Sequence, residues 1–269
     1  SSAANYGRWI RGLVKNKNIE NYNFASLDIT GKFKTGKIKH SLLAGIDADI
    51  IKTKAYSFDF TRFRADKKNI YDTINIFGTK EYTSRNDIPN VPWTFYTNTP
   101  VNRLGVYLQD FVELSSKIKL LAGLRYSVST IETPDSIYAN NNNKLNSKKR
   151  NNDAFSPRLG LVYQPTKTIS IFGSYTNTYE LNTALDTFNN VLQPSIIDQF
   201  EAGIKTLWFN ETVSVNATAY VINNNNAVQS YPNLAAGDTR RETGGQTQSK
   251  GFELDIVTKN IHGFSINAG

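Results

Sequence analysis

The stretch KLLAGLRYSV, Lys119–Val128, alternates between apolar side chains and side chains that are polar or small. One parity carries only apolar residues: Leu120, Ala122, Leu124, Tyr126 and Val128. The other parity carries Arg125 and Ser127. Because successive side chains of a β-strand point to opposite faces, this pattern predicts a strand with one apolar and one polar face.

The same alternation recurs along the chain, in HSLLAGIDADI (40–50), FSPRLGLVY (155–163), FEAGIKTLW (200–208) and GFELDI (251–256). It predicts an all-β chain of about ten strands, with a further candidate at residues 6–14. The expected strands lie near residues 22–33, 37–52, 101–113, 117–131, 153–164, 168–179, 196–209, 212–223, 247–259 and 263–269.

Short turns and long connections alternate along the chain between these strands. The short ones are KTGK (34–37), LSSK (114–117), QPTK (164–167), FNET (209–212) and NIHG (260–263). The long ones fall at about 55–100, 132–152, 180–195 and 225–245. Outer-membrane barrels have short periplasmic turns and long outer loops, so the rhythm predicts an antiparallel transmembrane β-barrel with its polar parity facing the lumen. No window of 18 apolar residues predicts a membrane-spanning helix.

Composition argues against several classes of function. The 269 residues include 15 Phe and 14 Tyr but no Cys, which removes disulfides, thiol catalysis and thiolate metal sites. The net charge of +8 comes from lysines spread over turns and loops, so we expect no nucleic-acid partner. No catalytic motif occurs, and His40 and His262 are the only histidines. We therefore expect neither an enzyme nor a metal site. Since no Met occurs and the last strand breaks off at Gly269, we expect a piece of a larger protein.

One strand breaks the pattern. In RLGVYLQDFVEL (103–114), Asp110 shares the parity of the apolar set Leu104, Val106 and Leu108. A charge on the lipid-facing side of a barrel strand is costly. Either this strand carries a bulge, or Asp110 lies beyond the hydrocarbon band.

Five blocks in order resemble consecutive barrel segments of TonB-dependent outer-membrane receptors, most closely the ferric-siderophore branch. They are NFASLDITGKFKTGKIKHSLLAGID (23–47), LGVYLQDFVELSSKIKLLAGLRYS (104–127), FSPRLGLVYQPTKTISIFGSYTNTY (155–179), IDQFEAGIKTLWFNETVSVNATAYVI (197–222) and SKGFELDI (249–256). The resemblance implies a 22-stranded barrel filled by an N-terminal plug. We expect residues 1–269 to form about half of that barrel, with the plug, the coupling box and the last strands outside this sequence.

The resemblance also implies a function and partners. Such receptors sit in the bacterial outer membrane, among outer-membrane lipid and lipopolysaccharide, and bind an iron–siderophore complex on the outer face. They import it with energy from the TonB–ExbB–ExbD complex, and no cofactor is expected. Two other interpretations stay open: a TonB-dependent importer of a glycan, peptide or cobalamin, and a passive porin or adhesion barrel. A soluble all-β binding protein is a third possibility from the residues alone.

The resemblance implies that aromatic side chains of the outer loops and the upper lumen contact the ligand, together with plug residues. Candidates are Trp93, Phe95 and Tyr96 on the first long loop, with Tyr179, Tyr220 and Tyr231 near other outer loops. The predicted lumen-facing charges, which would contact the plug or pair between strands, are Asp28, Asp47, Asp49, Arg125, Arg158, Glu201, Lys205, Glu253 and Asp255.

Overall fold

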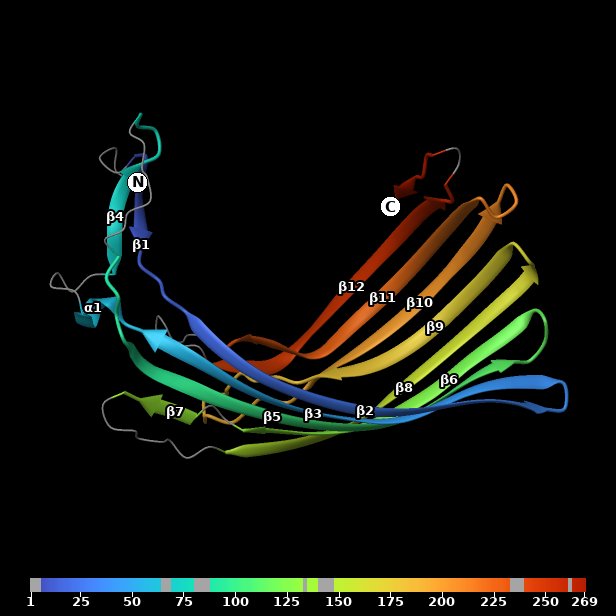
Figure 1. Cartoon of the computed structure of the whole chain (residues 1–269), viewed down its shortest axis with the longest axis horizontal. Helices are drawn as coiled ribbons and strands as arrows, with labels where there is room; N and C mark the ends of the chain where they lie inside the picture. The colour runs from blue at the N-terminus through green and yellow to red at the C-terminus, as the bar shows by residue number, and fades with distance from the viewer. Residues whose placement is uncertain are drawn as a thin grey trace. The chain divides into compact units, whose positions relative to one another are not determined.

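The chain is an antiparallel β structure, seen in a computed structural model that describes residues 6–63, 69–79, 88–132, 135–139, 148–232, 240–260 and 263–269 (Figure 1). By its internal contacts it divides into two units. The first comprises residues 1–22, 51–100 and 134–147, and the second comprises residues 23–50, 101–133 and 148–269. Long strands run from one unit into the other. Among the described residues, no helix has the length and apolar character needed to cross a membrane.

The strands of the large sheet pair in the order β13-β12-β11-β10-β9-β8-β6-β5-β3-β2. Their bounds are β2 (Lys17–Thr35), β3 (Ile38–Phe58), β5 (Trp93–Glu113), β6 (Ile118–Glu132), β8 (Lys149–Thr166), β9 (Ile169–Glu180), β10 (Ser195–Trp208), β11 (Val213–Ser230), β12 (Arg241–Thr258) and β13 (Asn267–Ala268). The predicted all-β antiparallel class is confirmed. The last strand is wrong in extent, because only Asn267 and Ala268 of 263–269 pair with β12.

The first unit holds the elements that the strand prediction missed or left open. The candidate at 6–14 is β1 (Arg8–Gly12), which pairs with β4 (Ile70–Asn75) in a separate two-stranded sheet. The unit also contains α1 (Phe60–Phe63) and β7 (Asp135–Tyr138), and β7 pairs with the start of β5. Leu13, Phe60 and Val91 form a small buried cluster. The interval 55–100 is therefore not simply a loop.

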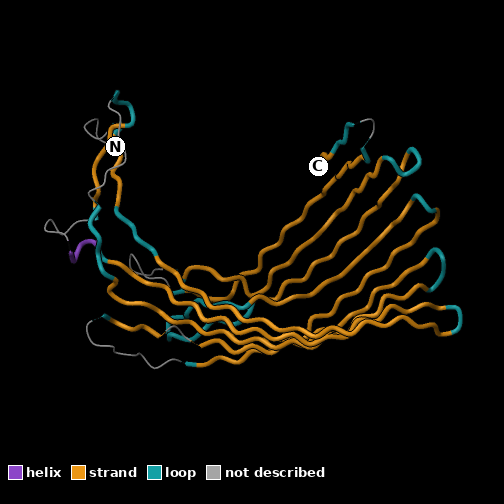
Figure 2. Tube along the Cα trace, in the orientation of Figure 1, coloured by secondary structure: helices purple, strands orange, loops and turns teal. Residues whose placement is uncertain are grey.

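In the second unit the short turns lie together at one end of the strands, as teal links between orange strands (Figure 2). The turn after β10 is unusual, since Phe209, Asn210 and Glu211 have φ of 53°, 54° and 63°. Three consecutive left-handed residues without a glycine cost free energy, which the flanking 13-pair register of β10 and β11 must hold in place.

At the end opposite the short turns, the strands extend further than predicted. Strand β11 continues through the asparagine run to Ser230, and β12 begins at Arg241 rather than near 247. A bulge with Asn226 at φ 58° interrupts their pairing without ending it. Polar strand ends keep the backbone ladder although they lack apolar alternation, which is why the sequence pattern misses them.

The register fixes which side chains share a face. One row crosses six strands and is apolar throughout: Ile118, Tyr163, Ile171, Ile204, Ala217 and Leu254. The side of the sheet that carries this row is called the apolar face below, and the other side the polar face.

The apolar face is not covered by the chain. Phe155 is 61% exposed, Leu161 50%, Ile204 39% and Leu254 45%. Only seven apolar side chains are buried among the described residues, so these four do not meet in a compact core. An apolar surface of this extent is foreign to a monomeric soluble protein and fits contact with lipid.

Asp110 lies on the apolar face without a bulge. The pairing of β5 with β6 runs unbroken from Val101 to Glu113, with Asp110 opposite Ala122. Its Oδ2 lies 2.6 Å from Nδ1 of His40, whose ring stacks on Phe33 at 4.6 Å between centroids. Of the two explanations for Asp110, the bulge is wrong. The residue lies three positions from the strand end and has a polar partner.

Candidate functional site

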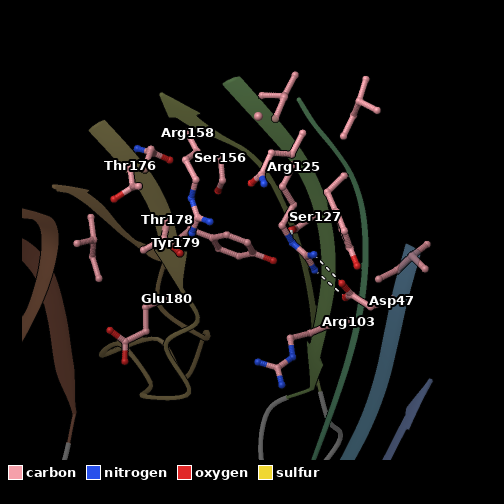
Figure 3. A pocket seen from close by; sticks show the side chains of 18 of the residues that line it. Asp47, Arg103, Arg125, Ser127, Ser156, Arg158, Thr176, Thr178, Tyr179 and Glu180 are labelled. Atoms are coloured by element: carbon pink, nitrogen blue, oxygen red, sulfur yellow. Dashed lines mark hydrogen bonds and ion pairs between the residues drawn. The ribbon is translucent and has the colours of Figure 1, made fainter. Parts of the chain in front are cut away.

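Polar side chains gather on the polar face of the second unit around a cavity of about 1170 Å³. The lining comes from β3, β5, β6, β8, β9 and the start of β10. Figure 3 shows Arg158, Thr176, Thr178 and Tyr179 on one side of it and Arg125, Arg103 and Asp47 on the other. Strand pairing of residues far apart in sequence creates this site.

Two ion pairs occupy one wall. Arg125 donates from Nη1 and Nη2 to the two oxygens of Asp47, at 2.6 and 2.7 Å, and from Nε to Ser127 at 2.8 Å. Its guanidinium lies 5.4 Å from the centroid of Tyr107, whose hydroxyl donates to Asp28. All three guanidinium nitrogens of Arg125 therefore already donate to the protein, and two of its five N–H groups remain.

The second pair lies next to the first. Arg103 Nε donates to both oxygens of Asp49, at 2.9 and 3.0 Å, and the Asp49 carboxylate is largely buried. A buried carboxylate that accepts from a cation through both oxygens is charge-compensated. Both pairs brace β3 against β5 and β6.

Arg158 differs from these two arginines. It lines the same cavity from β8, and it has no hydrogen-bond or ion-pair partner within the described part of the chain. In Figure 3 its guanidinium points into the cavity near the ring of Tyr179. Beside it lie the hydroxyls of Ser156 and Thr176. An open guanidinium next to hydroxyl groups suits an anionic or oxygen-rich ligand.

The other predicted charges also lie on the polar face, outside the cavity. Glu201 accepts from Gln199 Nε2 at 2.5 Å, and Asp255 accepts from Asn216 at 3.4 Å. Lys205 is opposite Asn216 and Glu253 is opposite Thr218 in the register. The nine predicted charges thus share one face, while any contact with a plug stays a prediction.

The predicted loop aromatics are placed differently from expectation. Trp93, Phe95 and Tyr96 begin strand β5, so their loop placement is wrong. Phe95 packs on Tyr138 at 5.4 Å between ring centroids, across the pairing of β5 with β7. Strand β7 lies within the interval 132–152, which was predicted to be a long connection. Trp93 and Tyr96 contact each other at 5.7 Å and both contact Tyr56.

This first-unit cluster carries positive charge. Lys17 lies 5.1 Å from the Tyr56 ring centroid and Lys54 5.5 Å from that of Tyr96. Three aromatic rings with two ammonium groups form a surface for a planar anionic group. The sequence indicated Trp93 and Tyr96 but not Tyr56, which is 37 residues earlier.

The remaining aromatic candidates are scattered. Tyr179 is the second-last residue of β9 and lines the cavity. Tyr220 lies in the middle of β11 rather than near a loop, with its ring across Gly251, where an added β-carbon would collide with it. Tyr231 follows β11 and is 40% exposed. His262 lies outside the described residues. No group of three or more metal-ligating side chains occurs in the parts of the chain that are described.

Arg103 and Tyr107 were not among the residues predicted for the polar face, although the alternation within their own strand places them there. Both have the parity opposite to Leu104, Val106 and Leu108, so the alternation that isolated Asp110 also places them on the polar face.

Comparison with known proteins decides the family. The family description "TonB dependent receptor-like, beta-barrel" matches residues 2–269. The chain belongs to this family of TonB-dependent outer-membrane receptors. That confirms the resemblance and the outer-membrane location that it implies.

Relatives of this TonB-dependent receptor chain carry names of metallophore receptors. The metal-pseudopaline receptor CntO of Pseudomonas aeruginosa is 22% identical, covering 95% of this chain and 35% of the relative. The probable TonB-dependent siderophore receptor PiuA of Acinetobacter baumannii is 24% identical over 90% of this chain and 34% of its own. The chain spans about a third of the length of these relatives.

Solved structures show the same fold. The crystal structure of PiuA from Acinetobacter baumannii aligns with a TM-score of 0.75 at 20% identity, covering 94% of this chain and 38% of that one. The ferric-catecholate import receptor Fiu of E. coli aligns at 0.72 and 14% identity, covering 90% and 36%. At these identities the likeness shows the fold of the TonB-dependent receptor barrel alone.

Proposed function

We propose that the receptor containing this chain imports a ferric siderophore across the outer membrane, with energy from TonB and the ExbB–ExbD proteins. The observation that carries the proposal is the polar cavity with an unpaired guanidinium, on a sheet whose opposite face is apolar and exposed. A sheet with one lipid-facing and one wet side suits passage of a polar solute. The names of CntO and PiuA support a metal chelate as that solute.

Within this proposal the side chains have different roles. Arg125 and Arg103 hold β3, β5 and β6 in register through Asp47 and Asp49. Arg158 contacts the oxygen-rich chelate or a carboxylate of the plug, because it is the cavity guanidinium without a described partner. No side chain acts as a catalyst, since the work is binding and transport.

The aromatic cluster of Tyr56, Trp93 and Tyr96 is a second proposed contact for the chelate. Catecholate groups are planar and anionic, which matches rings flanked by Lys17 and Lys54. Deletion of 85–100 would remove the first third of β5, so point substitutions are the appropriate probes. Trp93→Ala and Tyr96→Ala should weaken uptake of a catecholate chelate more than that of a hydroxamate chelate.

The test is iron uptake by a strain that lacks the receptor and carries the full-length gene or a variant. Radiolabelled ferric catecholate, ferric hydroxamate and a non-ferric chelate are supplied in turn, with and without TonB. We expect TonB-dependent uptake of a ferric chelate, reduced by Arg158→Gln and unchanged by Lys119→Gln, a polar-face cation near the short turns. Uptake of none of the chelates would refute siderophore import. Equal uptake without TonB would favour a passive barrel.

CntO's name, metal-pseudopaline receptor, does not specify iron, so we propose a chelate of another metal as the second candidate cargo. The non-ferric chelate arm of the same assay distinguishes it. Uptake of that complex in preference to the ferric ones would replace iron in the proposal and keep the transport mechanism.

A further inference from the structure

Positive charge gathers at the short turns of the second unit. The segment KFKTGKIK (32–39) joins β2 to β3, SSKIK (115–119) joins β5 to β6, and PTK (165–167) joins β8 to β9. Every charged side chain in these three segments is a lysine. The segments are far apart in sequence, but the fold brings their turns to the same end of the strands (Figure 2).

The three turns are neighbours along the sheet. Strand β3 lies next to β5, and β6 lies next to β8, so successive turns are two strands apart. At about 4.8 Å between strands and a tilt of about 40°, neighbouring turns are roughly 12 Å apart along the rim. The lysines therefore form an arc and not a compact pocket.

Four lysines of the arc are exposed and are called the rim lysines below: Lys34, Lys37, Lys117 and Lys167. Their ammonium groups have no ion-pair or hydrogen-bond partner among the described residues. Neighbouring lysines differ, because Lys39 lies 3.1 Å from Glu113 and Lys259 lies 3.9 Å from Glu211. The rim lysines are thus the part of this charge that is open to a partner.

The rim lysines point away from the lipid. Lys34 shares the parity of Asp28, which accepts a hydrogen bond from Tyr107 on the polar face. The other three lie in the turns themselves, between the ends of the strands. Since the short turns of such barrels are periplasmic, the rim lysines face the periplasm.

The residue types favour one kind of partner. Lysine is depleted in protein–protein interfaces, where Arg, Tyr and Trp are enriched, and the three segments contain none of these three types. An ammonium is a compact point charge that pairs with a single carboxylate. Each exposed pair is weak, so an arc of such charges suits a polymer whose carboxylates repeat and bind several lysines together.

We propose that the rim lysines bind the cell wall, by pairing with free carboxylates on the stem peptides of peptidoglycan. The charges are complementary, and the polymer lies on the side of the membrane that the short turns face. Anionic phospholipid headgroups suit the arc less well, because Lys34 is on the polar side of the sheet. The proposal rests on the membrane orientation of the sheet and not on the cargo.

The test is co-sedimentation of the purified full-length receptor, in detergent, with insoluble peptidoglycan sacculi. The probes are native sacculi and sacculi whose carboxylates have been chemically amidated. We expect the wild-type receptor to pellet with native sacculi, less in high salt, and to lose this binding on the amidated sacculi. Combining Lys34→Gln, Lys37→Gln and Lys117→Gln should weaken binding to native sacculi about tenfold.

The matched control removes the same charge from three exposed lysines that lie away from the short turns: Lys52→Gln, Lys149→Gln and Lys250→Gln. This control should bind native sacculi as the wild type does. All six substitutions are at exposed positions and leave the backbone pairing intact.

Three results would overturn the proposal: no pelleting of the wild-type receptor, equal pelleting with native and amidated sacculi, or wild-type binding by the variant that lacks three rim lysines. An equal loss in the control variant would also overturn it, because net charge alone would then explain the binding. Siderophore uptake can fail while this binding holds, so the outcome is separate from that of the transport assay.

Discussion

A charge placed on the apolar face tests the orientation of the sheet. Leu161 is 50% exposed on β8 and lies opposite Leu120 and Gly173. It is five residues from the end of β8 at Thr166, which corresponds to roughly 13 Å along the membrane normal. This depth is near the middle of the apolar band, where an arginine costs about 2–4 kcal/mol. Leu161→Arg should therefore lower the unfolding free energy of the full-length receptor by that amount.

The matched control is Ser174→Arg on the polar face at the same height, since Ser174 is opposite Gly160 and Glu201 in the register. An arginine there has room over the glycine and a carboxylate beside it, so we expect a change within about 0.5 kcal/mol. The measurement is guanidinium unfolding of the full-length receptor in lipid vesicles, followed by tryptophan fluorescence. Equal destabilisation by both substitutions would refute the two-faced interpretation.

Three further predictions concern the second unit. Gly105→Ala should disrupt the Arg125 network, because a β-carbon there would overlap the Arg125 guanidinium, whereas Gly31→Ala meets nothing within 4 Å; thermal unfolding of both variants measures the difference. Glu211→Gly should raise the unfolding free energy by about 0.5–1 kcal/mol by relieving a φ of 63°, and Glu211→Ala, which keeps the strain, should give no gain. Burial opposes ionisation of Asp186 in the β9–β10 connection, but N–H donors from Asn190 and Phe188 outweigh it and lower its pKa below the ordinary 3.8. That loop is therefore stabilised above pH 3.8 and loses the contribution as pH falls below it. The protection of its amides against exchange, measured relative to the intrinsic rate at each pH, should therefore fall in acid for the wild type and show no such step in Asp186→Asn.

Alternation of apolar and polar residues was enough to predict the long strands of the second unit and their facing, but not β4 or β7. It depends on local sequence alone, and the row from Ile118 to Leu254 confirms it across six strands. The loop-side ends of the strands could not be predicted, because residues such as Asn223–Asn226 pair through the backbone without an apolar face. Trp93–Tyr96 were also assigned to a loop, although Trp93 and Phe95 alternate with Thr94.

The site was predictable in part. Parity placed Asp47 and Arg125 on one face. Their bidentate contact, between residues 78 apart in sequence, depends on the order β3-β5-β6 in the sheet. The isolation of Arg158 is a property of its spatial neighbours and has no signature in its own strand. The arc of rim lysines likewise follows from the order of the strands, which no single segment encodes.

The measurement closest to the central claim is a spin-label scan of β8 in the full-length receptor in vesicles. The 269 residues contain no cysteine, so single cysteines for labelling can be placed freely in this segment. Labels at Leu159 and Leu161 should collide often with oxygen dissolved in lipid and rarely with a water-soluble nickel complex, and labels at Arg158 and Gly160 should do the reverse. Uniform accessibility along 158–161, or water access at Leu159 and Leu161, would contradict the account.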